Sequence, residues 1–167
     1  MTQRTLNKAR VWRLGADVDT DALAPGAYMK HGLEVIGWHC LEAVRSDFAS
    51  GVREGDVIVA GANFGIGSSR EQAAGVLRHL GLAAVVAPSY SGLYFRNAFN
   101  LGLLLLTCPQ ADLIEEGERV GVSFEGETPV VVRANGQRLA CAPIPDFLMD
   151  MVDAGGLLPL LKQRKPA

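Results

Sequence analysis

The stretch DVIVAGANFGIGSSREQAAGVLRHLGLAAVVA, residues 56–87, decides the fold of this chain. Two short apolar runs, at residues 56–60 and 83–87, flank a glycine-rich turn at residues 61–67 and an amphipathic segment at residues 69–80. Short, continuously apolar runs are typical of parallel strands that are covered on both faces, and a helix between them makes a crossover connection. The stretch therefore predicts a βαβ unit within a parallel sheet.

The other elements are expected from apolar spacing and from turn residues. We predict helices at residues 34–48, 91–100 and 145–154, and strands at residues 10–14, 103–107, 118–124, 130–133 and 138–142. Asn135-Gly136 is typical of a hairpin turn, and Gly155-Gly156 is typical of a helix C-cap. We expect one α/β domain over residues 1–167, with a mixed, partly parallel sheet and a small β elaboration near its C-terminal end.

Composition narrows the class of protein. The chain has 167 residues, is 49% hydrophobic and carries a formal net charge of -2, which is typical of a soluble globular protein with its own core. Its positive residues are scattered, so we expect no nucleic-acid partner. No run approaches the roughly 18 apolar residues that span a bilayer, and the N-terminus has no apolar signal region. We therefore expect no membrane partner and a cytoplasmic location.

Neither the cysteines nor the histidines form a metal-binding pattern. The cysteines are Cys40, Cys108 and Cys141, and the histidines are His31, His39 and His79. The cysteines are far apart and odd in number, and the histidines lack the spacing of zinc-binding helices. We expect buried thiols in a reducing compartment and no metal site built from this chain alone.

The end of the glycine-rich turn carries the candidate chemistry. Ser68-Ser69-Arg70-Glu71 fits the capping box S-x-x-E, in which Ser68 accepts from the N–H of Glu71 at a helix start. Arg70 would then lie in the first helical turn, where the helix dipole disfavours a cation unless an anion lies beside it. Free N–H groups, two hydroxyls and the guanidinium could together bind a carboxylate. A well-formed helix start with no further role is the alternative.

Other anion-binding and catalytic signatures fit less well. The Walker pattern is missing, and G-x-G-x-x-G fails because Arg70 occupies the position of its third glycine. G-x-S-x-G is also absent, and no histidine is placed to serve as a base for either serine. Nucleotide binding is a minor alternative, and an ordinary serine hydrolase is disfavoured.

Three stretches follow one another along the chain: DVDTDALAPGAY at residues 17–28, GANFGIGSSREQA at residues 61–73 and SYSGLYFRNAFNLGL at residues 89–103. Together they resemble the signature motifs of the aconitase superfamily swivelling domain, in particular the small subunits of 3-isopropylmalate dehydratase and their homoaconitase relatives. The three motifs cover nearly the whole chain in the expected order, so the resemblance is specific.

The resemblance implies a three-layer swivelling β/β/α fold that docks on a separate large subunit carrying a [4Fe-4S] cluster. It also implies a hydro-lyase reaction, in which a hydroxy acid is dehydrated and the alkene is rehydrated with the hydroxyl on the neighbouring carbon. In this family the open iron of the cluster acts as a Lewis acid and the swivelling domain supplies the base. No cofactor is then expected on this chain itself.

The resemblance also implies roles for particular residues. Ser68 matches the catalytic base, while Ser69 and Arg70 match groups that hold the substrate. Asp21 matches the acidic residue of the T-D motif; it is a second catalytic candidate beside Ser68, expected near the catalytic groups at the subunit junction. An aspartate that only braces the turn before Pro25 is the alternative for this position.

Two positions set this chain apart from many relatives. Gln72 stands where many read His, and an amide cannot carry the charge of an imidazole, so a proton-handling role there is doubtful. Lys30 lies in the loop at which the family senses the distinguishing substituent of the substrate. It is a candidate substrate-binding residue for a carboxylate, although its stem could instead cover an apolar group, or it could be a solvated loop lysine.

The leading hypothesis is isomerisation of 2-isopropylmalate to 3-isopropylmalate in leucine biosynthesis, by a small subunit that is active only with its large subunit. A homoaconitase or a methylmalate- or dimethylmalate-type hydratase is the alternative within the class. Outside the class, the chain could be a non-catalytic anion-binding module. The presence of a large partner with cluster-ligating cysteines would distinguish the enzyme from the module.

Overall fold

The computed structural model describes residues 6–126 and 128–164, and within these residues seven strands form one mixed sheet. The strands are β1 (Leu6–Arg13), β2 (Val57–Val59), β3 (Ala84–Ala87), β4 (Leu105–Thr107), β5 (Arg119–Glu125), β6 (Thr128–Val132) and β7 (Arg138–Ala140). Their order across the sheet is β4-β3-β2-β1-β5-β6-β7. The pairs among β1, β2, β3 and β4 are parallel, whereas the pairs among β1, β5, β6 and β7 are antiparallel. The predicted mixed, partly parallel sheet is confirmed.

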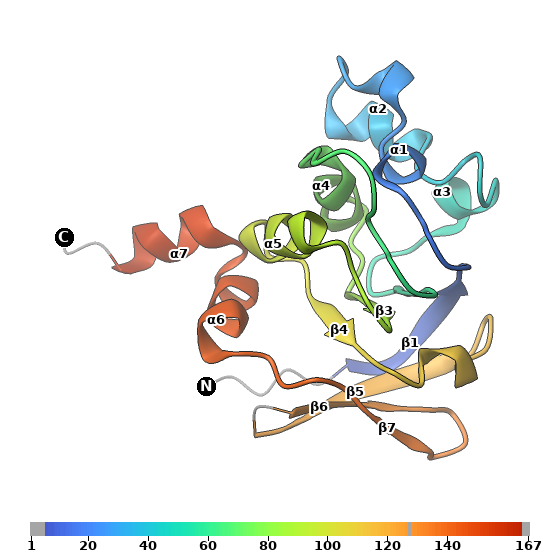
Figure 1. Ribbon diagram of the computed structural model, residues 1–167, viewed down its shortest axis with the longest axis vertical. Coiled ribbons are helices and arrows are strands. Elements are labelled where there is room, and N and C mark those ends of the chain that lie inside the picture. The colour runs from blue at the N-terminus through green and yellow to red at the C-terminus, as the bar shows by residue number, and fades with distance from the viewer. Residues whose placement is uncertain (1–5, 127, 165–167) are drawn as a thin grey trace.

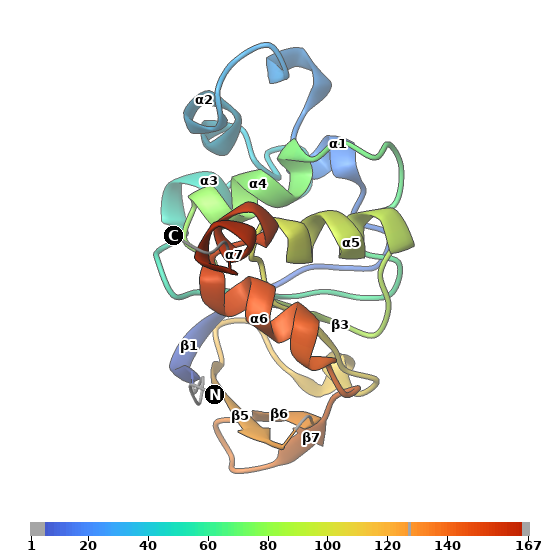
Figure 2. The ribbon, with the colours of Figure 1, turned by 90° about the vertical axis from the view of Figure 1, so that its left-hand side faces the viewer.

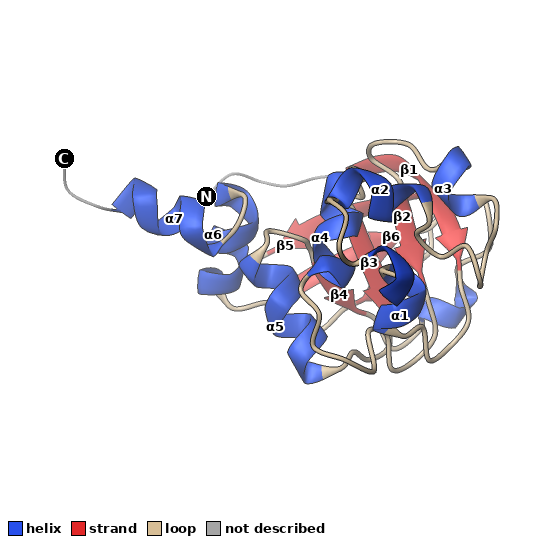
Figure 3. Ribbon diagram, turned by 90° about the horizontal axis from the view of Figure 1, so that it is seen from above, coloured by secondary structure: helices blue, strands red, loops and turns tan. Residues whose placement is uncertain are grey.

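The helices lie mainly on one side of the parallel strands. They are α1 (Thr20–Leu23), α2 (Leu33–Trp38), α3 (Phe48–Gly51), α4 (Gln72–His79), α5 (Gly92–Asn100), α6 (Asp146–Ala154) and α7 (Leu157–Arg164), with short 3₁₀ turns at Gly26–Tyr28 and Ala111–Leu113. Helices, parallel strands and antiparallel strands stack as three layers (Figures 1 and 2). Seen from above, α1, α2 and α4 lie over the strands, while α7 projects beyond the sheet (Figure 3). This arrangement confirms the expected β/β/α layering.

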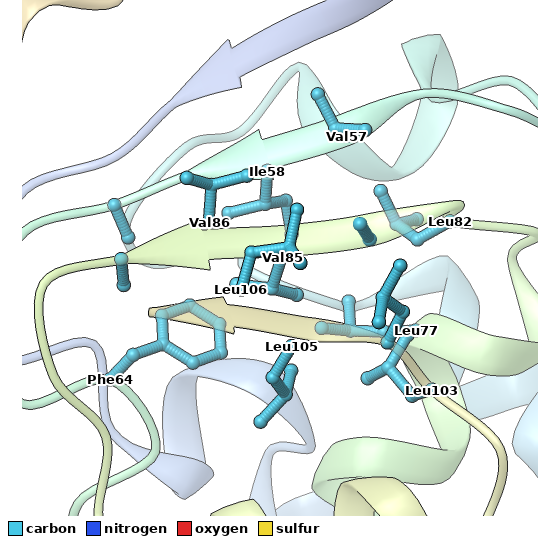
Figure 4. Close-up of a cluster of buried hydrophobic side chains, with 14 of the residues drawn as sticks. Val57, Ile58, Phe64, Leu77, Leu82, Val85, Val86, Leu103, Leu105 and Leu106 are labelled. Carbon is cyan, nitrogen blue, oxygen red and sulfur yellow. The ribbon is translucent and has the colours of Figure 1, made fainter. Parts of the chain in front are cut away.

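The core lies between the parallel strands and the helices that cover them. Strands β2 and β3 are buried at every residue, as their continuously apolar sequences predict. From α4, Leu77 points into this layer, and Phe64 lies beside the carboxyl ends of the strands (Figure 4). The predicted βαβ unit is confirmed, because β2 and β3 are parallel neighbours joined through α4.

The predicted helix over residues 34–48 is wrong in its extent. Helix α2 ends at Trp38, whose side chain is 64% exposed, and a separate helix α3 begins only at Phe48. Between them Leu41 has a φ of +61°, and its N–H donates to the carbonyl of Ala22 at 2.8 Å. A left-handed residue whose N–H is bonded outside the helix cannot continue the α-helical ladder. Within this range Leu41 and Phe48 are buried but Trp38 and Val44 are exposed, so the apolar spacing did not mark one buried helical face.

The C-terminal half follows the prediction, with one addition. Strands β6 and β7 form a hairpin, and Gly136 in its turn has a φ of +89°. Helix α6 ends at Gly155, which is left-handed as expected for a C-cap. Helix α7 was not predicted; its Leu160 is buried, while Leu158 and Leu161 are exposed.

Two further expectations can be compared with the described residues. The three cysteines are buried and free, as predicted. Among residues 6–126 and 128–164, no helix has both the length and the apolar character that crossing a membrane requires.

The glycine-rich turn depends on a close contact at Gly65, which generates a stability prediction. Gly65 has a φ of +84°, and a Cβ atom there would lie 2.2 Å from Cγ of the buried Tyr94. We expect Gly65→Ala to lower the free energy of unfolding by about 3 kcal/mol, measured by urea denaturation. Gly55 is the matched control, because it has a φ of +92° with no atom within 4 Å of a built Cβ. Gly55→Ala should cost about 1 kcal/mol of backbone strain; equal losses for the two variants would contradict the contact with Tyr94.

Candidate functional site

The candidate site is built from the loops that follow β1, β2 and β3. These strands are parallel, so their carboxyl ends lie at the same edge of the sheet. The N–H of Gly65 donates to the carbonyl of Val18 at 2.7 Å, and the N–H of Thr20 donates to the carbonyl of Ile66 at 2.9 Å. The N–H of Phe64 donates to the carbonyl of Ser89 at 3.2 Å. The backbone therefore joins the three sequence motifs into one surface.

Side chains from all three motifs brace this surface. Asp17 and Asn63 have φ values of +59° and +62°, and Nδ2 of Asn63 donates to Oδ1 of Asp17 at 3.0 Å. The N–H of Asn63 also donates to Oγ of Ser89 at 2.9 Å. Asp and Asn are among the few non-glycine residues that enter the left-handed region, which is the sequence signal that could have identified this pair. The brace was not predicted.

The predicted capping box at Ser68 is wrong. Helix α4 begins at Gln72, with Glu71 before it in helical geometry and no side-chain cap. Ser68 and Ser69 are exposed in the segment before the helix, and their hydroxyls form no hydrogen bond within the described part of the chain. Gly67 has a φ of +105° next to the Thr20–Ile66 backbone bond, so the chain is held in a turn at the position where a helix start was expected.

The same segment presents a run of unpaired backbone donors. From Gly67 to Glu71, none of the five consecutive N–H groups finds an acceptor among residues 6–126 and 128–164. These groups precede an eight-residue helix, α4, whose dipole places partial positive charge at this end. Unpaired backbone donors before a helix N-terminus can bind a carboxylate or stabilise a developing oxyanion.

Arg70 is held beside this surface by the first motif. Its Nη1 donates to Oδ1 of Asp21 at 3.1 Å and to the carbonyl of Ala24 at 2.9 Å. The anion beside Arg70 is thus a side chain of the chain itself, whereas the expectation was a bound carboxylate. Arg70 also precedes α4, whereas it was expected to lie in the first turn of the helix. Nε and Nη2 of Arg70 have no hydrogen-bond partner among the described residues. One side of the guanidinium is therefore fixed while the other remains available for bidentate bonding.

Asp21 has a second hydrogen bond that sets its charge. Its Oδ1 also accepts from the N–H of Gly26 at 2.9 Å, across the turn that contains Pro25. This backbone hydrogen bond, followed by the hydrogen bond and charge of Arg70, holds the pKa of the Asp21 carboxyl below its usual value. Asp21 is therefore ionised near neutral pH. It braces the turn, which was the alternative role considered for it, and it orients Arg70 at the same time.

Lys30 and Gln72 are the remaining sequence candidates. Lys30 is exposed two residues beyond the 3₁₀ turn Gly26–Tyr28 and forms no ion pair within the described residues. No contact brings it to Arg70, so its role in substrate binding stays a prediction. Gln72 is the half-buried first residue of α4, beside a small surface groove that also touches Leu33.

The described residues do not supply ligands for a metal cluster. Among residues 6–126 and 128–164, no group of three or more His, Cys, Asp or Glu side chains could hold a metal ion. Burial raises the pKa of the Cys40 thiol above its usual range, which disfavours the thiolate that a metal would need. These residues therefore do not fit an iron–sulfur cluster.

A comparison with protein families matches the central part of the chain. Residues 47–111, from α3 to the 3₁₀ turn that follows β4, match the family described as the aconitase C-terminal domain. The fold and the site thus define an aconitase-type domain.

Longer matches identify the family within this class. The small subunit 1 of 3-isopropylmalate dehydratase from Methanopyrus kandleri is 42% identical over 98% of this chain and 96% of that protein. The small subunit from Methanosarcina mazei is 42% identical over 90% of this chain and 93% of that protein. A crystal structure of 3-isopropylmalate dehydratase from Methanocaldococcus jannaschii has a TM-score of 0.88 and 36% identity, covering 96% of this chain and 95% of that one. The chain belongs to the family of 3-isopropylmalate dehydratase small subunits.

The contacts of Asp21 predict its titration. Because folding lowers the pKa of this carboxyl, the ionised form is favoured in the folded state. Its contribution to stability is present above the unfolded pKa, about 3.9, and is lost as the pH falls through the folded pKa. We expect Arg70→Ala to raise the Asp21 pKa only part of the way to the usual value, because the Gly26 N–H remains. Carboxyl NMR titration measures this, with the exposed Arg96→Ala as control; an unchanged Asp21 pKa in Arg70→Ala would contradict the pairing.

Proposed function

We propose that this chain is the small subunit of a 3-isopropylmalate dehydratase, a hydro-lyase that interconverts 2- and 3-isopropylmalate in leucine biosynthesis together with a large subunit. The observation that carries the proposal is the family relation, which extends over 98% of the chain for one relative. The relatives compared above bear the isopropylmalate name, so the comparisons do not favour a homoaconitase, a dimethylmalate-type hydratase or a non-catalytic module.

Substrate binding is proposed for the surface around Arg70. The free side of its guanidinium, with the hydroxyl of Ser69 and the N–H groups from Gly67 to Glu71, can hold a carboxylate by charge-assisted hydrogen bonds. Asp21 keeps the guanidinium oriented before the substrate arrives, so less side-chain freedom is lost on binding. In this proposal Asp21 acts through Arg70 and remains ionised throughout.

Ser68 is proposed as the catalytic base. It would remove the proton from the carbon α to a carboxylate while the hydroxyl leaves the neighbouring carbon; addition of water in the reverse sense exchanges the two positions. A neutral serine hydroxyl is too weak a base for this step, so its alkoxide must be stabilised. The unpaired N–H groups of Gly67 to Glu71 and the cationic Arg70, two residues along the chain, support the assignment, because positive potential beside Ser68 would stabilise that charge.

The rest of the active site is assigned to the partner. We propose that the large subunit carries a [4Fe-4S] cluster and that it covers the exposed face at Ser68 and Ser69. The name of the relatives, small subunit, supports a division of the enzyme between two chains. Lys30 is proposed to contact the substituent that distinguishes one hydroxy acid from another, and a cytoplasmic location is proposed for the complex.

Co-purification with the native large subunit tests the proposed function. The anaerobically assembled complex should turn over isopropylmalate in preference to homocitrate, citramalate and dimethylmalate. The isolated small subunit should be inactive toward all four, because it lacks the cluster. Turnover by the isolated chain, or a complex that acts only on the other three acids, would overturn the proposal.

Ser68→Ala tests the proposed base within that complex. Loss of a general base typically lowers the rate by 10²- to 10⁴-fold, so we expect kcat to fall by about 10³-fold while the two subunits still associate. Ser46→Ala is the matched control, since Ser46 is an exposed serine outside the site loops. Near-normal turnover by Ser68→Ala would remove Ser68 from the mechanism.

A further inference from the structure

The segment from Pro25 to His31 begins at the proposed carboxylate site. Immediately before it, the carbonyl of Ala24 accepts from Arg70, and within it the N–H of Gly26 donates to Asp21. The segment then arches over the tip of the molecule between α1 and α2 (Figure 2, top). We call residues 25–31 the tip loop. Its position relative to Arg70 determines which of its side chains can reach a substrate held by that guanidinium.

The middle of the tip loop is held by packing of Tyr28 and Met29 against the core and by one aromatic contact. The ring of Tyr28 stacks on the imidazole of His39 with centroids 3.7 Å apart and ring planes 5° from parallel. Nδ1 of His39 is in turn 2.7 Å from Oε2 of Glu42, a hydrogen bond that fixes the rotation of the imidazole. The backbone hydrogen bonds inside the tip loop join only neighbouring residues, such as the N–H of His31 to the carbonyl of Tyr28. The stack, by contrast, connects Tyr28 to a residue outside the tip loop, His39.

His39, the other partner in this stack, is held in place by the buried residues that follow it. His39 is followed by Cys40 and Leu41, both fully buried. The N–H of Leu41 donates to the carbonyl of Ala22 at 2.8 Å, which ties the support back to α1, the helix that carries Asp21. The tip loop is thus anchored at its start by Asp21 and at its middle by His39. Both anchors are connected to α1: Asp21 lies in this helix, and Leu41, close after His39, is hydrogen-bonded to it.

We infer that His39, oriented by Glu42, is a positioning residue for substrate selection, because it holds the tip loop at a fixed distance from the carboxylate-binding Arg70. A partly exposed His–Glu pair contributes little to stability by itself, so its effect should be local. Removing it should leave the fold and the carboxylate anchor intact while the tip loop loses its fixed position. The part of this inference that concerns substrates rests on the proposed function; the part that concerns loop order does not.

Hydrogen exchange on the full chain tests the loop without any assay of activity. We expect His39→Ala to speed amide exchange in residues 25–31 by about fivefold, since it removes the stacked ring. His39→Phe keeps a flat ring over Tyr28 and should restore most of the protection. Glu34→Gln is the matched control, because Glu34 is an exposed glutamate on α2 without a hydrogen bond or ion pair in the described chain. Wild-type exchange in His39→Ala would overturn the inference.

The effect of His39 on substrate selection is tested by measuring selectivity in the reconstituted complex. We expect His39→Ala to lower the ratio of kcat/KM for isopropylmalate over dimethylmalate by about tenfold, with His39→Phe close to wild type. Equal loss for both substrates, with an unchanged ratio, would show a structural role only and would contradict the inference. If the wild-type complex acts on neither acid, the proposed function fails, whereas the exchange measurement still decides whether His39 orders the tip loop.

Discussion

The close approach of the turn after β2 to the segment after β1 is the constraint on which the site depends. At Gly61 a Cβ atom would lie 2.7 Å from the backbone N of Ala16, so only glycine allows the two chains to come this near. That approach lets the segments exchange backbone hydrogen bonds through Gly65 and Ile66. Without it, the separate segments that carry Asp21 and Arg70 would not be held side by side. The electrostatics of the site thus follow from a backbone contact.

Much of the fold could be predicted because its signals are local and repeated. Continuously apolar runs on either side of an amphipathic segment have few structural interpretations, and the βαβ unit followed directly. The helix predicted over residues 34–48 failed because its apolar residues do not share one buried face: Trp38 and Val44 are exposed, and the backbone turns at Leu41. Leu41 is buried as the spacing required, yet its N–H is bonded to another segment. Long-range hydrogen bonds of this kind leave no pattern in the nearby sequence.

In the site, too, features of the nearby sequence were predictable, whereas contacts with distant segments were not. A cation next to a helix start indicated an anion, and one anion proved to be Asp21, which is 49 residues away. The sequence indicated that Arg70 needs a neighbouring anion, but it did not indicate that Asp21 supplies one. The capping box failed for a related reason: Ser68 and Glu71 have the right types and spacing, but Gly67 and its neighbours are held by contacts with the first motif. Tertiary structure overrode a local preference.

The five unpaired N–H groups from Gly67 to Glu71 have a consequence for how two subunits can close over this face. In the free chain, water can satisfy them. A covering surface that expels this water without offering an acceptor leaves each buried donor unsatisfied, which costs about 1–3 kcal/mol per group. A bound carboxylate removes much of that penalty. If a partner surface covers this face, as proposed, covering the empty site would therefore be disfavoured relative to covering a bound anion.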